Sequence, residues 1–250
     1  MKNRIKQCFG KAAACYGDAA SVQKKVAFQC AQYCPEGQFK KVLDVGSGVG
    51  FLFSELKDRI VFDSYVSLDL VLPMLLEQKK LSVPLLVAAD GENIPLQKKQ
   101  FDLLVSSSAM QWYSNPEESI PQSFKMLKRG GCFTIAIFVK GTLCELADIS
   151  LKTGFGSVKE LKDAEFYMGI ISGISNVRVS FNRMRHEVYF PSVIEFLRNH
   201  KRTGAVASSG SISWGKSKYL NFIKEYEKKY GGEQGVRASY EVLFAYGEVF

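Results

Sequence analysis

Residues 42–50 constrain this chain more than any other segment, because they place a glycine at every second position directly after a short apolar strand. The letters are V-L-D-V-G-S-G-V-G, and a stretch of helical character, 51–59, follows. Glycine has no Cβ, so the backbone can turn sharply there and a ligand can lie against it. A loop at the start of a helix also offers backbone N–H groups without partners inside the helix. The segment therefore predicts a loop that binds a nucleotide-like ligand.

The spacing of the glycines narrows the class of ligand. A dinucleotide-binding turn reads G-x-G-x-x-G, and a phosphate-binding loop requires G-x-x-x-x-G-K-[ST]. Here the pattern is G-x-G-x-G, and Asp44 lies two positions before the first glycine. A carboxylate repels phosphates but attracts an ammonium group, so a ligand with an adenosine end and an amino-acid end fits best.

This pattern resembles motif I of the class I methyltransferases, which bind S-adenosyl-L-methionine. The alternative is a glycine-rich turn without a chemical role. The resemblance assigns cofactor binding to Asp44, Gly46, Ser47, Gly48 and Gly50.

Acidic residues also end the next two predicted strands, 66–69 and 85–90. In dinucleotide folds, an acid about 20 residues after the glycine loop accepts the ribose hydroxyls. Residues 90–96 resemble the adenine-binding loop of the same methyltransferases, in which the acid accepts from the exocyclic amine. A single acid at a strand end is usually a helix cap or a solvated charge, but three in register favour one binding site. The further cofactor residues assigned in this way are Asp69, Leu70, Asp90, Gly91 and Ser106.

Strands and helices alternate from residue 40 to 139, in the rhythm of a parallel sheet. We predict an α/β fold with a Rossmann-like, seven-stranded, mostly parallel sheet, helices on both faces and a helical lid insertion. The chain is expected to form a single domain, 1–250, with an N-terminal helical cover at 1–35 and the lid at 141–175. Further helices are predicted at 141–156, 158–169, 192–200 and 216–230, and strands at 176–190 and 240–250.

The composition is that of a folded domain. A chain of 250 residues with an apolar fraction of 46% can bury a full core. No signal-peptide pattern occurs, and the longest apolar run, 133–139, is far too short to span a membrane. The six cysteines include no C-x-x-C pair and no histidine cluster accompanies them, so no metal site is predicted. We expect a cytoplasmic protein with reduced thiols and no membrane contact.

The net charge of +8 favours an anionic partner. Nucleic acid is disfavoured as that partner. Adenine-N6 methyltransferases carry an Asn/Asp-Pro-Pro-aromatic motif after the fourth strand, whereas this chain has S-S-S-A at 106–109. No recognisable RNA-binding module is present either.

Segments spread over nearly the whole chain resemble the malonyl-acyl carrier protein O-methyltransferases of biotin synthesis. The sequence departs from that pattern at Ser107, where asparagine is usual, and at Arg129, where proline is usual. Neither departure touches the cofactor acids. Related enzymes such as aconitate methyltransferases share parts of these segments. The segments are 9–16, 108–112, 140–146, 201–205 and 239–244.

The resemblance implies methyl transfer to the free carboxylate of a malonyl thioester. A carboxylic acid with a pKa of about 4 is ionised at neutral pH, so it needs no general base. Catalysis then rests on orientation and on excluding water. Lys201 and Arg202 are predicted to hold this carboxylate, with a solvated basic loop as the alternative. Tyr16 is predicted to contact the acceptor or the cofactor, or else to be a core residue. Gln111 and Trp112 are predicted to shape the pocket.

The implied partner is an acyl carrier protein that carries malonyl, or malonyl-coenzyme A, and the chain is expected to be a monomer. Carrier proteins are acidic, so the basic stretches 201–202 and 216–229 could dock one. Two alternatives stay open. One is a methyltransferase of a small free carboxylic acid, a phenol or a quinone, and the other is a non-catalytic protein that binds S-adenosylmethionine.

Overall fold

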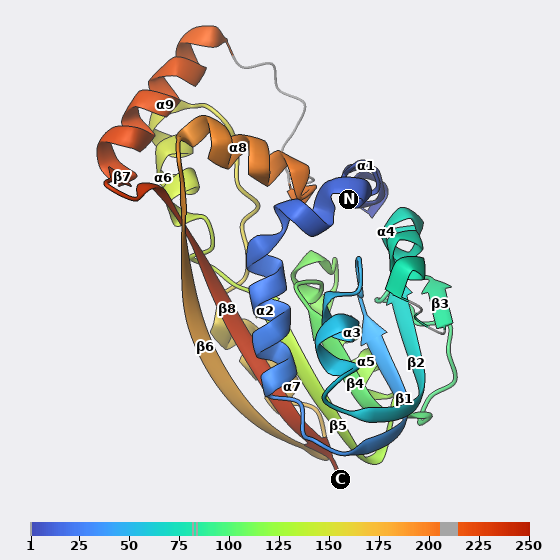
Figure 1. The fold of residues 1–250 in the computed structure, drawn as a ribbon. Helices are drawn as coiled ribbons and strands as arrows, with labels where there is room; N and C mark the ends of the chain where they lie inside the picture. Colours follow the sequence, from blue (N-terminus) through green and yellow to red (C-terminus); the bar gives the residue numbers. More distant parts are fainter. Residues whose placement is uncertain (1, 82, 84, 206–214) are drawn as a thin grey trace.

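A computed structural model describes residues 2–81, 83, 85–205 and 215–250 (Figure 1). One twisted sheet forms its centre, with the strand order β3-β2-β1-β4-β5-β8-β6 and β7 paired beside β8. Strands β1 to β5 are parallel, and β8 runs antiparallel to both β5 and β6. The strands are β1 (Gln38–Val45), β2 (Val61–Asp69), β3 (Leu85–Ala88), β4 (Phe101–Ser107), β5 (Leu127–Phe138), β6 (Val177–Phe190), β7 (Gly231–Gly232) and β8 (Gly235–Val249).

The predicted α/β fold with a mostly parallel sheet is therefore confirmed, and the structure shows in addition that the strands beside β5 pair antiparallel. The seven predicted strands form the path of the sheet, and the two-residue β7 is an addition that carries no sequence signal. Strand β8 begins at Gly235, five residues before the predicted start at Tyr240.

Helices cover both faces of the sheet, as predicted. The helices α2 (Ser21–Gln32) and α3 (Phe51–Leu56) place their apolar residues in one buried cluster. The helices α5 (Pro116–Phe124) and α7 (Ala164–Ser172) belong to a second cluster on the opposite face. The other helices are α1 (Lys2–Ala19), α4 (Leu72–Glu77), η1 (Gln78–Leu81), η2 (Met110–Trp112), α6 (Cys144–Thr153), α8 (Val193–Arg202) and α9 (Lys216–Tyr230).

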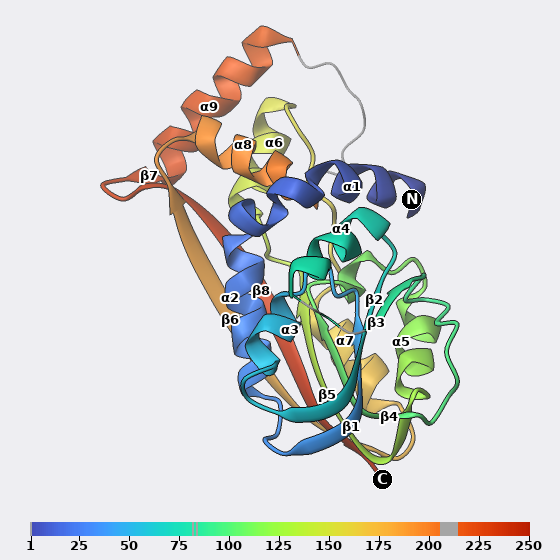
Figure 2. The ribbon, with the colours of Figure 1, turned by 45° about the vertical axis from the view of Figure 1, so that its right-hand side comes forward.

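The strand order reverses between β1 and β4, because β2 and β3 lie on one side of β1 and β4 and β5 on the other. Loops that leave neighbouring strands toward opposite faces open a crevice at the carboxyl ends of those strands. Helix α1 lies beyond this edge of the sheet in both views (Figures 1 and 2). The predicted N-terminal helical stretch is two helices, α1 and α2, separated at the buried Ala20.

Strands β6 and β8 are longer than the parallel strands and pair along their whole length, from Val177 opposite Val249 to Phe190 opposite Val236. Their far ends extend past the sheet to α6, α8 and α9, near α1 (Figure 1). Ser192 caps α8 by accepting a hydrogen bond from the Glu195 N–H.

The structure divides the segment 141–175, which was expected to form one insertion. Helix α6 contacts α9 and β8, whereas α7 contacts α5 and β6 on the other face of the sheet. The predicted helix 158–169 begins only at Ala164, because Asp163 caps it by accepting from the Phe166 N–H at 2.8 Å. The connection between the two helices, 154–163, has no regular structure.

No helix among the described residues is both long enough and apolar enough to cross a membrane.

Candidate active site

The crevice at the carboxyl ends of β1, β2 and β4 holds a cavity, called here the first cavity. Residues of α1 close it on the side away from the sheet. The residues that line it and that were predicted to bind the cofactor or the substrate are Tyr16, Asp44, Gly46, Ser47, Gly48, Asp69, Leu70, Asp90, Gly91 and Trp112.

The glycine loop passes very close to the segment that follows β4. Gly46 has a φ of +72°, and a Cβ placed on it would lie 2.2 Å from the Cβ of Ala109. Its N–H and that of Ser47 donate to the Leu68 carbonyl, and the Gly48 N–H donates to Asp69 Oδ2 at 2.8 Å. The expectation of free backbone donors at these three residues is therefore wrong. The loop supplies a close backbone approach, while its N–H groups tie it to the end of β2.

Two predicted cofactor residues lie outside the lining of the first cavity. A Cβ on Gly50 would meet Leu81 Cδ1 at 2.8 Å, so this glycine serves the packing of α3 against η1. Ser106 is buried, and its hydroxyl donates to the Val45 carbonyl at 2.7 Å. Side chains alternate along a strand, so Ser107, the next residue, faces the cavity instead.

Asp44 is buried and lacks a partner for one of its oxygens. Its Oδ2 accepts from the Tyr65 hydroxyl at 2.8 Å, and its Oδ1 has no hydrogen-bond partner among the described residues. Burial, together with the nearby charge of Asp69, raises the pKa of Asp44 to about 7. An ammonium group at Oδ1 would satisfy this oxygen and favour its ionised form. The residues present therefore fit the amino-acid end of S-adenosylmethionine.

Asp69 ends β2, and its two oxygens hold the loops on either side. Oδ2 accepts from the Gly48 N–H, and Oδ1 accepts from the Val71 N–H, each at 2.8 Å. Burial raises the pKa of Asp69 despite these hydrogen bonds. Each carboxylate oxygen keeps a second lone pair, so the predicted bonds from ribose hydroxyls stay compatible with this geometry.

Asp90 is engaged by a residue that the sequence did not indicate. The ammonium of Lys2, on α1, lies 2.6 Å from Asp90 Oδ2 and 2.8 Å from Glu92 Oε2. Burial alone would raise the pKa of Glu92, but hydrogen bonds from Lys2, Ser114, Asn115 and Ser119 lower it to about 2. Lys2 therefore ties α1 to the predicted adenine loop.

A second cavity adjoins the first and shares part of its wall. Phe9, Tyr16, Gln23, Ser108 and Trp112 line both cavities. Phe9 lies edge-on to Trp112 with ring centroids 5.4 Å apart. Burial raises the pKa of Tyr16 well above its usual range. Tyr16 and Trp112 thus lie at the boundary between the two cavities.

Two strained residues also line the second cavity. Ser108 has a φ of +59° and Leu143 a φ of +55°, which is rare for residues other than glycine. The N–H of Ser108 donates to the Ala136 carbonyl, and that of Leu143 to the Ser239 carbonyl. Such strain persists where the surroundings fix it, and it gathers at functional sites.

The second cavity also contains Gln111, another predicted residue. Its Nε2 donates to the Ser108 carbonyl at 2.6 Å, while its buried Oε1 has no partner among the described residues. His200 lines this cavity too, and burial lowers the pKa of His200 to about 4. This histidine is neutral at pH 7.

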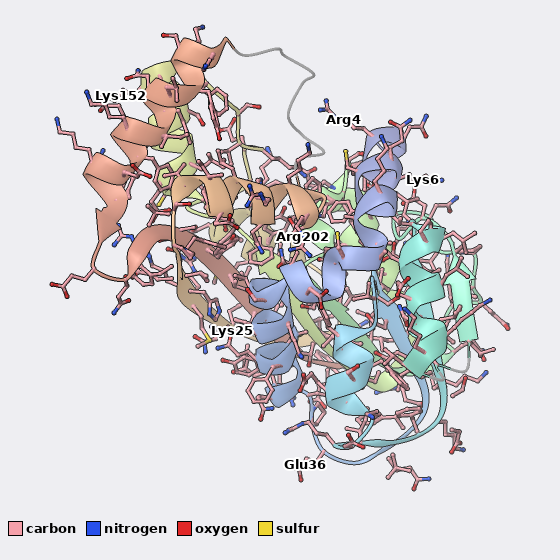
Figure 3. All side chains as sticks on the ribbon, turned by 45° about the horizontal axis from the view of Figure 1, so that its top comes forward. Arg4, Lys6, Lys25, Glu36, Lys152 and Arg202 are labelled. Carbon is pink, nitrogen blue, oxygen red and sulfur yellow. The ribbon has the colours of Figure 1, made fainter. Side chains whose placement is uncertain are left out.

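The two predicted anion-binding residues do not line either cavity. Lys201 and Arg202 are exposed at the end of α8, although their neighbours His200 and Thr203 line the second cavity. Figure 3 places Arg202 where α8 meets the N-terminal helices, and its carbonyl accepts from the thiol of Cys15. Among the described residues, the lysine that lines this cavity is Lys159, from the connection 154–163.

Lys2, Gln23 and Lys159 are polar lining residues that the sequence analysis did not predict, and Gln78, outside both linings, is an unpredicted contact of the glycine loop. Gln78 is buried, and its Nε2 bridges Ser47 Oγ at 2.8 Å and the Gly48 carbonyl at 2.6 Å. A buried glutamine shortly after the second strand is a signal only once the loop that it clamps is known. Lys2, Gln23 and Lys159 lie in segments whose patterns predict helices or loops but no site.

The comparisons with known proteins agree with this geometry. Residues 43–135 match the model of a methyltransferase domain. The chain is 29% identical to malonyl-[acyl-carrier protein] O-methyltransferases of a Marinomonas species and of Geobacter sulfurreducens. The first match covers 97% of this chain and 92% of the relative, and the second covers 99% and 98%. A Bacillus halodurans protein, solved as a candidate methyltransferase, superposes with a TM-score of 0.63. It is 15% identical, and the match covers 90% of this chain and 100% of that protein.

The fold, the glycine loop with its acids and the matched domain define a class I methyltransferase that uses S-adenosyl-L-methionine. Within that class, the chain resembles the malonyl-[acyl-carrier protein] O-methyltransferases over nearly its whole length.

Proposed function

We propose that this enzyme methylates the free carboxylate of a malonyl thioester on acyl carrier protein, an early step of biotin synthesis. The names of its relatives support this acceptor. The second cavity supports it independently, through the chemistry of its lining.

The observation that carries the proposal is a lining without carboxylates. Among the described residues that line the second cavity, none is Asp or Glu, and one is a lysine. The remainder are aromatic, aliphatic or small polar residues, together with the neutral His200. Such a cavity accepts a single anionic group on an otherwise weakly polar chain, and it disfavours a cationic acceptor.

The reaction needs little from the protein besides position. Asp44, Asp69 and Asp90 would hold S-adenosylmethionine, which would supply an electrophilic methyl group for the acceptor oxygen when bound. The acceptor oxygen is already ionised, so no proton has to move. Tyr16, Trp112 and Phe9 then serve to align the acceptor with the first cavity and to exclude water.

The proposal includes the roles predicted for other parts of the chain. Asp44 would bind the ammonium of the cofactor, Asp69 its ribose and Asp90 its adenine. The chain would act as one domain, with α1 and the connection 154–163 as covers of the two cavities. The exposed Lys201 and Arg202 would contact the acidic carrier outside the cavity.

The test is transfer of a labelled methyl group to malonyl-acyl carrier protein, with malonyl-coenzyme A, free malonate and a phenol as parallel acceptors. We expect a base-labile methyl ester on the carrier-bound malonyl group, formed faster than on free malonate. Equal rates on free malonate and the carrier would reduce the proposal to a small-acid methyltransferase. Methylation of the phenol alone would refute a carboxylate acceptor.

A further inference from the structure

We propose that Lys159 holds the carboxylate of the methyl acceptor in the second cavity, in place of the exposed Lys201 and Arg202. This inference rests on the proposed function, because it presumes an anionic acceptor. It names a substrate-binding residue in a segment that no motif marked.

Lys159 is a partly buried cation without an anionic partner. Its ammonium donates to the Gln111 carbonyl and lies 4.4 Å from the ring centroid of Trp112. It forms no ion pair with any described carboxylate, and the charge of Glu92 acts on it only from a distance. An ammonium has three donors, and the described residues supply one acceptor.

The other cations near the site are differently placed. Lys2 is held between Asp90 and Glu92 in the first cavity. Lys162, three residues after Lys159, is exposed and lies 5.1 Å from the ring centroid of Phe166. Among the described residues that line the second cavity, Lys159 alone carries a positive charge at pH 7, because His200 is neutral there.

The position of Lys159 is also suited to the reaction. Trp112 belongs to the wall that both cavities share, so an anion bound beside Trp112 lies next to the boundary with the first cavity. Gln111, whose carbonyl holds Lys159, belongs to the same short helix, η2. An acceptor carboxylate on this ammonium would therefore be held by the segment that forms the boundary. The ion pair would be partly desolvated, which strengthens it relative to one in water.

The first test compares Lys159→Met, Lys159→Arg and the matched control Lys162→Met. We expect Lys159→Met to raise the KM for the malonyl thioester about 10- to 100-fold, the range for a charge-assisted hydrogen bond. Lys159→Arg should restore most of the affinity, and Lys162→Met should behave as the wild type. The dissociation constant of S-adenosylmethionine should be unchanged in all three, which shows that the fold and the first cavity are intact.

The dependence of kcat/KM on pH distinguishes a role of the Lys159 charge from a purely structural role of this residue. Burial lowers the pKa of Lys159 to about 8. The wild-type kcat/KM should therefore fall as pH rises past about 8, and Lys159→Arg should move that fall to higher pH. The neighbouring groups do not titrate in this range: the pKa values of Glu92 and His200 are about 2 and 4, and burial raises those of Tyr16 and Tyr240 well above their usual range.

A binding measurement separates this inference from the proposed function. Calorimetry of malonyl-coenzyme A, in the presence of S-adenosylhomocysteine, should detect binding to the wild type and to Lys162→Met but not to Lys159→Met. If the wild type methylates the thioester and Lys159→Met equals Lys162→Met in KM and binding, Lys159 is not the anchor. If the wild type neither binds nor methylates any carboxylate, the proposed function and this inference both fail.

Discussion

Replacing Asp44 by Asn should stabilise the empty enzyme and weaken cofactor binding. Asp44 is buried, its Oδ1 has no partner among the described residues, and its pKa is raised from 3.8 to about 7. An acid whose pKa is higher in the folded chain stabilises the fold at low pH. That contribution disappears as pH rises from about 4 to about 7, where the buried group must ionise.

The size of the change in stability follows from the shift in the pKa of Asp44. Three pKa units correspond to about 4 kcal/mol between pH 4 and pH 8, an upper limit because the fold can relax around the charge. Asparagine keeps the acceptor for the Tyr65 hydroxyl and carries no charge. The free energy of unfolding of Asp44→Asn relative to the wild type should therefore increase with pH by a few kcal/mol.

Urea denaturation of the cofactor-free proteins at pH 4, 6 and 8 measures this difference. Asp102→Asn is the matched control, because hydrogen bonds from Lys128 and the Lys41 N–H lower the pKa of Asp102 despite its partial burial. Its contribution has the opposite sign: it is present at neutral pH and lost as pH falls below about 4. Calorimetry should show S-adenosylmethionine binding about 10- to 100-fold weaker to Asp44→Asn. If Asp44→Asn is less stable than the wild type at pH 8, or if the difference is independent of pH, the reasoning is refuted.

Three further experiments test other parts of the site. Gly46→Ala places a Cβ 2.2 Å from that of Ala109, whereas Gly48→Ala adds only left-handed strain, since nothing lies within 4 Å of its Cβ. Cofactor affinity should fall more than about tenfold in Gly46→Ala and about fivefold in Gly48→Ala, which corresponds to a strain of roughly 1 kcal/mol. Equal losses in calorimetry would argue against the close approach. Lys2→Met removes the ion pairs that tie α1 to Asp90 and Glu92, so stopped-flow fluorescence should show faster cofactor dissociation, and an unchanged rate would exclude this tie as a barrier. Replacing Lys201 and Arg202 by Ala should raise the KM for malonyl-acyl carrier protein at low salt but not that for malonyl-coenzyme A. The difference should vanish at high ionic strength, and persistence of the effect there would rule out electrostatic docking.

The cofactor half of the site could be predicted because its signals are local. The glycine spacing and the acids at strand ends are read directly from short segments, and parallel strands bring their carboxyl ends to one edge. Asp44, Asp69 and Asp90 therefore fall together in the first cavity. Ser106 lies outside the lining of this cavity because one step along a strand reverses the face, and the sequence does not fix that phase. Gly50 also lies outside the lining, and the sequence does not distinguish a glycine required by packing from one required by ligand approach.

The acceptor half could not be predicted in the same way. Lys201 and Arg202 end an amphipathic helix, and which of its residues face inward depends on how α8 packs against its neighbours. Lys159 lies in a connection without periodicity, so its burial beside Trp112 is decided entirely by tertiary structure. The family resemblance implied a cation for the carboxylate, and our proposal that Lys159 is this cation depends on the tertiary structure.

The two unpartnered charges of the site have a common explanation. Other carboxylates have partners for their charge: Glu145 accepts from Arg237 and Ser239, Glu92 lies beside the ammonium of Lys2, and Asp69 accepts from two backbone N–H groups. Among the described residues, Asp44 and Lys159 have no counter-ion in two cavities that share a wall, although burial penalises both charged forms. Because such groups cost stability, their presence here supports the proposals that the ligands bring the counter-charges, an ammonium for Asp44 and a carboxylate for Lys159. Replacing either Asp44 or Lys159 by a neutral residue should therefore raise the free energy of unfolding of the ligand-free enzyme. The same replacement should weaken binding of the ligand that contacts that residue.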